Sequence, residues 1–145
     1  MSLVLDIADA VAAELANAPA GTFSQSFTPR RLVLPQFELS ELKDLQVSIV
    51  PRAAENSLAA RGLALKEVQI DIGIQKRLGK DIDTEIEPLL TLLEQIDAYL
   101  RQRPLQAVQG APWLKSTNDP IYASEHLAND RVFTSVLTVS YRVMV

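Results

Sequence analysis

The sequence predicts an α+β domain: a mainly antiparallel mixed sheet of four to five strands, with two main helices packed on one face. Apolar and polar side chains alternate along residues 131–145 (RVFTSVLTVSYRVMV) and along residues 68–75. Such alternation indicates strands with one apolar face. Apolar side chains recur at helical spacing in residues 3–18 and 83–103, which indicates two amphipathic helices. Helices and a sheet bury such faces against one another, so a layered domain follows.

Composition favours one folded domain spanning residues 1–145. The chain has 145 residues, of which 48% are hydrophobic and 22% charged, and it contains no cysteine. A chain of this length can bury enough surface to fold without disulfides or metals. The absence of cysteine excludes disulfides, thiolate nucleophiles and cysteine metal ligands.

Charge and hydropathy argue against two classes of partner. The formal net charge of -4 disfavours nucleic-acid binding, which normally requires a basic face. The opening MSLVLDIADAVAAELANA carries acidic residues where a signal peptide would be basic or apolar. No apolar run approaches the roughly 18 residues of a membrane span. We therefore expect a protein that is made in the cytoplasm and binds no membrane.

Both predicted helices carry start and stop signals. The first has Ser2 as its N-cap and ends before Pro19 and Gly21. The second begins at Asp83 or Thr84 and ends near Arg103. Their apolar stripes are Val4, Ile7, Val11 and Leu15, and then Ile86, Leu89, Leu93, Ile96 and Leu100.

The first half also contains strand patterns and one long connection. Residues 22–34 have an extended character, and the strands predicted at 45–51 and 68–75 are expected to pair as an antiparallel hairpin. The sequence between them, residues 52–65, is interpreted as a long loop. Loops of this length are uncommon without a function, so it is a candidate working surface; a short helical turn or an excursion without a role is the alternative.

Residues 105–130 are punctuated by Pro and Gly and are predicted to be irregular. Short extended pieces are expected at 111–117 and 120–123. A turn is expected at 124–127, before the final strand.

No motif for catalysis is apparent. The chain has neither a glycine-rich phosphate loop nor a serine nucleophile elbow, and His126 is its single histidine. A metal or general-base cluster could be assembled from His126 with Asp119, Glu125 and Asp130, but solvated or capping carboxylates explain these residues more simply. The prediction is a protein without catalytic residues, metal or cofactor.

Several side chains are candidates for an interface with other subunits or partners. Arginines make the first half comparatively basic, while the second helix begins with acidic residues, so neighbouring copies could meet head to tail. Two aromatic residues in loops either plug the end of the sheet or anchor an interface. The candidate interface residues are Arg30, Arg31, Arg52, Glu55, Asn56, Arg61, Trp113 and Tyr122.

Taken in order, nearly the whole chain resembles a phage tail-assembly family. The segments that carry the resemblance are LDIADAVAAEL, LQVSIVP, VQIDIGIQK, EIEPLLTLLEQIDAYL and APWLKSTNDPIYASEHLANDRVFTSVLTVSYRV. They resemble the lambda-type tail terminators, minor tail proteins that cap the finished tail tube and meet the head connector.

The resemblance implies a mixed sheet flanked by helices and a hexameric ring in the virion. Its implied partners are copies of the chain, the tail-tube protein and head-connector proteins, and its implied place is the host cytoplasm and then the tail. Two other classes stay open: a small metal-assisted hydrolase using His126 and nearby carboxylates, and a ligand-binding module with an apolar pocket near Trp113 and Tyr122.

Overall fold

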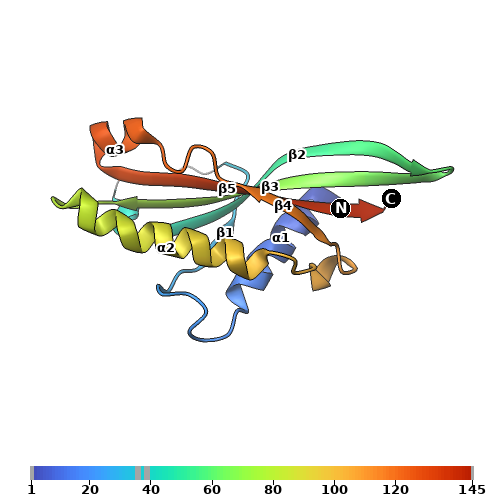
Figure 1. The fold of residues 1–145 in the computed structure, drawn as a ribbon, viewed down its shortest axis with the longest axis horizontal. Helices are drawn as coiled ribbons and strands as arrows, with labels where there is room; N and C mark the ends of the chain where they lie inside the picture. The colour runs from blue at the N-terminus through green and yellow to red at the C-terminus, as the bar shows by residue number, and fades with distance from the viewer. Residues whose placement is uncertain (1, 35–36, 38–39, 145) are drawn as a thin grey trace.

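A computed structural model describes residues 2–34, 37 and 40–144, and it confirms the predicted α+β class. Five strands form one mixed sheet in the order β1-β2-β3-β5-β4, and helices pack against it (Figure 1). β1 runs parallel to β2, and the other neighbouring strands are antiparallel. The helices and strands are α1 (Leu3–Ala16), β1 (Pro29–Arg31), η1 (Glu41–Lys43), β2 (Gln46–Ala60), β3 (Leu63–Arg77), α2 (Ile82–Leu100), η2 (Gln106–Val108), β4 (Trp113–Thr117), α3 (Ser124–Asp130) and β5 (Val132–Met144).

The core lies between one face of the sheet and the two main helices. α1 and α2 lie on the same side of the sheet, whereas α3 lies beside β5 on the other side (Figure 1). The side chains of this core face come from alternate positions of the two central strands and are fully or almost fully buried: Val68, Ile70, Ile72 and Ile74 on β3, and Phe133, Leu137, Val139 and Tyr141 on β5. The predicted apolar stripes of both helices meet them, with Val4 and Ile86 only partly buried. The opposite face of the sheet, called the open face below, carries mostly polar side chains.

Polar side chains fix the beginnings of both helices. Ser2 caps α1, because its hydroxyl accepts a hydrogen bond from the Leu5 amide at 3.3 Å. α2 begins slightly earlier than predicted, since Asp81 caps it by accepting from the Thr84 amide at 3.3 Å. The Glu85 carboxylate reaches back to the Gly79 amide at 3.1 Å. Acidic residues at this helix start therefore satisfy free backbone amides.

The prediction of a long loop at residues 52–65 is wrong. β2 continues to Ala60 and β3 already begins at Leu63, so the hairpin closes with a two-residue turn, Arg61 and Gly62. Gly62 takes a φ of 77°, which glycine adopts without strain. The alternation fails here because residues 52–58 are exposed, so no buried face selects apolar side chains at every second position. Residues 52–65 form the far part of this hairpin, called the arm below; its tip, residues 58–64, projects beyond the end of β5, where Met144 pairs with Leu65 (Figure 1).

The remaining predictions have mixed outcomes. The extended piece at 111–117 contains β4, and the turn expected at 124–127 is the start of helix α3. The piece at 120–123 is not a strand. Of residues 22–34 only Pro29–Arg31 forms a strand, and Phe23 and Phe27 pack against the core instead.

Candidate functional site

The arm exposes a long strand edge. β1 pairs with β2 only at residues 47–49, and the Leu32 amide adds one bond to the Ile49 carbonyl. Beyond that point the outer edge of β2 has no strand partner among the described residues. Free strand edges display unpaired amide and carbonyl groups that can pair with another chain. The arm therefore offers a surface for strand addition or for docking.

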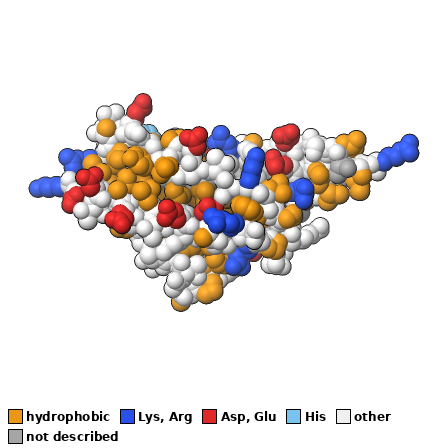
Figure 2. All heavy atoms as spheres, viewed as in Figure 1, with side chains coloured by type: hydrophobic (Ala, Val, Ile, Leu, Met, Phe, Trp, Pro, Cys, Tyr) orange, Lys and Arg blue, Asp and Glu red, His pale blue; other side chains and the backbone are white. Residues whose placement is uncertain are grey.

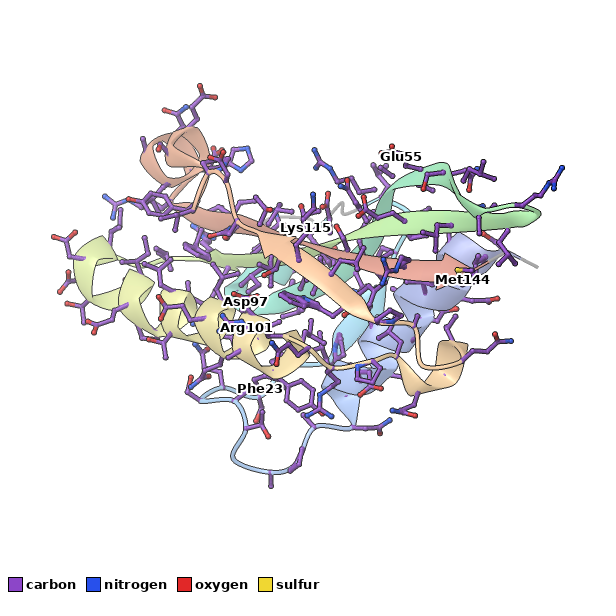
Figure 3. The ribbon with its side chains drawn as sticks, turned by 45° about the vertical axis from the view of Figure 1, so that its right-hand side comes forward. Phe23, Glu55, Asp97, Arg101, Lys115 and Met144 are labelled. Atoms are coloured by element: carbon purple, nitrogen blue, oxygen red, sulfur yellow. The ribbon has the colours of Figure 1, made fainter. Side chains whose placement is uncertain are left out.

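Four of the candidate interface residues lie on this arm: Arg52, which is described below, and Glu55, Asn56 and Arg61. Glu55 stands opposite Glu67 of β3, and Asn56 stands opposite Lys66. Figure 3 shows Glu55 on the side of the arm away from the helices. Arg61 occupies the turn, and its side chain is exposed. Within the described part of the chain, the side chains of Glu55, Asn56 and Arg61 form no hydrogen bond or ion pair, so they are free to meet a partner.

Two leucines near the tip are a feature that the sequence analysis missed. Leu58 is 79% exposed and Leu63 is 47% exposed. Figure 2 shows hydrophobic side chains gathered near the far end of the arm, with a basic side chain at its extremity. The sequence LAARGL could have indicated this feature, because its glycine is typical of a tight turn and a leucine lies on either side of that turn.

Arg30 and Arg31 lie on β1, at the sheet edge next to α1, and both make contacts within the chain. The Arg31 Nε donates to the Asp9 Oδ1 of α1 at 2.8 Å, and the Arg30 guanidinium stacks over the Phe37 ring at 5.7 Å. These contacts attach the edge strand to its surroundings. They make both arginines weaker candidates for an interface than Arg61.

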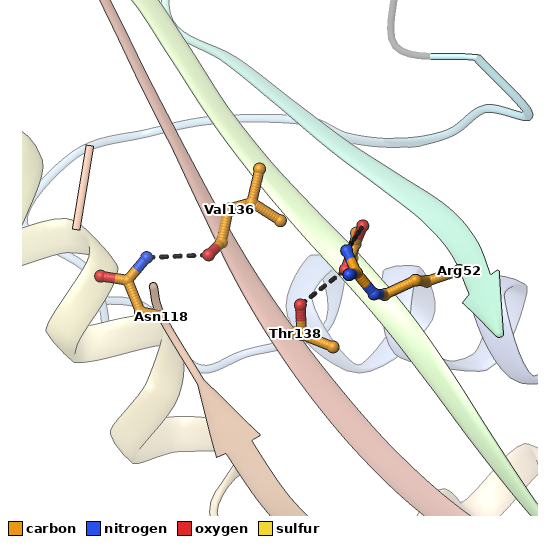
Figure 4. Close-up of polar contacts among 5 residues, drawn as sticks. Arg52, Asn118, Val136 and Thr138 are labelled. Atoms are coloured by element: carbon orange, nitrogen blue, oxygen red, sulfur yellow. Dashed lines mark hydrogen bonds and ion pairs between the residues drawn. The ribbon is translucent and has the colours of Figure 1, made fainter. Parts of the chain in front are cut away.

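Arg52 lies on the open face of the sheet, where a bulge places it. β2 has an extra residue between Pro51 and Ala53, so Arg52 has no position opposite it on β3. Its Nη1 lies 3.3 Å from the Asp71 Oδ2, and the Thr138 hydroxyl donates to the other oxygen of Asp71 at 2.7 Å (Figure 4). The three residues link β2, β3 and β5 by polar contacts.

A shallow polar hollow of about 470 Å³ surrounds this cluster. Near it the Asn118 amide donates to the Val136 carbonyl at 2.8 Å, which holds the chain that follows β4 against β5 (Figure 4). The hollow is lined by Arg52, Gln69, Asp71, Lys115, Thr117, Asp119, Pro120, Ala123, Thr134, Val136, Thr138 and Ser140. Neither Trp113 nor Tyr122 lines it, so this hollow is not the apolar pocket of the ligand-binding alternative.

Trp113 and Tyr122 are half-buried and pack against the core. Trp113 stands opposite Tyr141 in the β4–β5 ladder, and the Tyr122 ring lies 6.3 Å from the Phe133 ring. Both residues fill the margin of the core, as the packing interpretation of the sequence expects. The structure does not bring them near the arm.

The histidine contacts a hydroxyl. His126 Nδ1 lies 3.0 Å from the Thr134 Oγ1. Within residues 2–34, 37 and 40–144, no three or more His, Asp or Glu side chains are grouped so that they could hold a metal ion. The cluster of His126 with Asp119, Glu125 and Asp130 is therefore not assembled.

The hydroxyl of Tyr141 has a strongly perturbed pKa. Burial raises the pKa of the Tyr141 hydroxyl far above its ordinary value, and the negative charge of Glu14 raises it further. No described group forms a hydrogen bond with this hydroxyl. It lies inside the core, away from the open face and from the tip of the arm, so it bears on stability and not on a site.

No protein-family model and no curated protein sequence matches this chain. In the described part of the chain, no helix is long and apolar enough to cross a membrane.

Proposed function

We propose that this chain is a structural protein of a phage tail, which assembles as a ring, completes the tail tube and joins it to the head. It acts without catalysis, first in the host cytoplasm and then in the virion. The sequence resemblance to tail terminators supports this role, and so does the mixed sheet with helices that the resemblance implies.

The observation that carries the proposal is the arm. A hairpin whose tip projects away from the core gives an assembly protein a second contact surface distant from the first. The arm has an unpaired strand edge, an exposed arginine and two exposed leucines. A partner that covered these leucines would remove their apolar surface from water, which favours association. A ring needs two such different surfaces on each subunit.

A ring also explains how weak contacts could suffice. Each subunit contact is small, but contacts repeated around a closed ring on a tube end act together, so their effective affinity is greater than that of one pair. A chain that is monomeric when dilute is compatible with this function.

The test is reconstitution of tail completion. Tail tubes from a phage that lacks this gene are incubated with the purified chain, heads are then added, and joined particles are counted by electron microscopy. We expect joined particles with the wild-type chain and few with a variant whose arm is shortened. Tubes that stay uncapped and unjoined at every concentration of the wild-type chain would contradict the proposal.

A further inference from the structure

The tip of the arm has the shape of a two-sided wedge. Leu58 pairs with Ala64, and Leu63 pairs with Ala60. Residues paired across a ladder share a face, and successive residues of a strand point to opposite faces. Leu58 and Leu63 therefore project from opposite faces of the hairpin, and Arg61 lies between them at the turn. A wedge of this kind fits into a groove with two apolar walls better than onto a flat surface.

The same chain contains such a groove, at the end of the molecule where β5 finishes. It has a volume of about 680 Å³, lies between α1, η2 and the end of β5, and is mostly apolar. Figure 3 shows Met144 at the end of β5, near α1; this side chain is 52% exposed. The lining residues are Leu3, Asp6, Asp9, Ala10, Ala13, Ala107, Val108, Gln109, Val143 and Met144.

Charge makes the wedge and the groove complementary. Among the described residues that line the groove, the charged side chains are Asp6 and Asp9 of α1, and both are acidic. Asp9 already pairs with Arg31, whereas no described residue forms an ion pair with Asp6. Arg61 at the tip is exposed and has no ion-pair partner among the residues that the structure describes. If the tip entered the groove, Arg61 would lie beside the carboxylate of Asp6. The two leucines would at the same time contact the apolar residues that line the groove.

The wedge cannot enter the groove of its own chain. β3 pairs with β5 up to Leu65 opposite Met144, so the groove lies beside the base of the arm and the tip lies beyond it. Folding the tip back would break the β2–β3 ladder, which continues to the pair Ala60 and Leu63.

We infer that the groove receives the arm tip of a second copy of this chain, with Leu58 and Leu63 on the apolar walls and Arg61 beside Asp6. The inference rests on the proposed assembly function, since it names the contact by which copies join. Wedge and groove are different surfaces, so the contact either runs head to tail until a ring closes or is exchanged mutually in a dimer.

Cross-linking tests the contact directly, because the natural chain contains no cysteine. Ala60→Cys at the tip and Ala13→Cys in the groove are both at exposed positions. The two variants are mixed at high concentration and treated with a short bismaleimide. We expect a cross-linked species that contains one chain of each kind, at several times the yield of either variant alone. Ala98→Cys, an exposed alanine of α2 that does not line the groove, is the matched control for Ala13→Cys and should give only background.

Charge reversal tests the ion pair. Arg61→Asp and Asp6→Lys should each lower the cross-linking yield about tenfold, and a mixture of Arg61→Asp tips with Asp6→Lys grooves should restore it. The matched control is Arg77→Asp, an exposed arginine at the other end of β3, which should leave the yield unchanged. Leu58→Ser combined with Leu63→Ser should abolish the yield, whereas Ile121→Ser, at a residue that is 56% exposed, should not.

The contact and the proposed function fail in different ways. No enrichment of the mixed species over the Ala98→Cys control would overturn the contact, even if the chain caps tail tubes by other surfaces. A strong mixed cross-link in a species with the mass of a dimer, without any capping of tubes, would support the contact and overturn the tail function.

Discussion

At the scale of single residues, the hydroxyl of Tyr141 is a buried polar group without a hydrogen-bond partner among the described residues. The side chain is fully buried, and no described group forms a hydrogen bond with its oxygen. Burying a hydroxyl without a partner costs about 1–3 kcal/mol. Its ring is nevertheless among the largest side chains of the core, so packing rather than polarity fixes this residue.

We predict that Tyr141→Phe raises the free energy of unfolding by about 1 kcal/mol at neutral pH, because it removes the unsatisfied hydroxyl and keeps the ring. Denaturant titration measures the change. Tyr122→Phe is the control: Tyr122 is only half-buried, so its effect should stay within about 0.5 kcal/mol. A loss of stability in Tyr141→Phe would show that the hydroxyl has a partner.

The raised pKa of Tyr141 also predicts how stability depends on alkaline pH. In the unfolded chain this hydroxyl ionises near pH 10, whereas burial keeps it protonated in the folded protein. Above about pH 10 the unfolded state therefore releases a proton that the folded state retains, and stability falls as pH rises. Thermal melts between pH 8 and about pH 11 should show this decline reduced in Tyr141→Phe. An identical decline in both proteins would mean that other groups cause it.

At the scale of elements, β2 and β3 approach closely at Gly73. A Cβ added there would lie 2.7 Å from the Ser48 Oγ on the neighbouring strand, and Ser48 is buried. The pair stands directly across the ladder. The glycine thus allows the serine hydroxyl to fit within the sheet.

We predict that Gly73→Ala costs about 1–3 kcal/mol of stability, because the new methyl group overpacks the site. Adding Ser48→Ala should recover much of this loss, since it removes the clashing oxygen. The two single variants and the double variant, compared by denaturant titration, measure this coupling. Strictly additive effects would contradict the proposed clash.

The arm should be dispensable for folding. Its exposed residues contribute little to the core, so replacing residues 58–64 by Asn-Gly, a favourable two-residue turn between Ser57 and Leu65, removes the tip alone. We expect the free energy of unfolding to change by less than about 1 kcal/mol while self-association is lost. The measurements are denaturant titration and cross-linking on the same preparations. If the shortened variant is unfolded, the tip of the arm is needed for folding and this prediction is wrong.

The elements that the sequence predicted well are those with one buried face. The final strand and the two amphipathic helices each have one face toward the core and one toward solvent. The pattern of apolar and polar residues in the sequence therefore indicates which element forms. The arm could not be predicted in this way, because solvent surrounds residues 52–58. Only its turn, Arg61 with Gly62, leaves a local signal.

The sequence predicted some of the candidate interface residues better than others. Residues 52–65 were selected for their length, and they include the exposed arm with Arg61, although as a hairpin and not a loop. Arg31 and Trp113 are exceptions, since one pairs with Asp9 and the other packs against the core. Both side chains contact residues that are distant in the sequence. Local sequence patterns do not show such contacts, so these two residues could not be ruled out as interface residues from the sequence alone.

At the scale of the whole molecule, the arm tip and the groove are separate surfaces of opposite charge near one end of the protein. The proposed contact joins copies of the chain through these two surfaces and requires no change of fold. The shape of the molecule, with an apolar core at one end and a bare hairpin at the other, suits a subunit better than an isolated domain.

Copies of this chain are proposed to join one another on a tail tube. The most direct measurement is an electron cryomicroscopy reconstruction of tail-tube ends after incubation with the purified chain. We predict a closed ring in which the arm tip of each subunit lies in the groove of the next. Bare tube ends, or bound chains whose arms touch no other copy, would contradict it.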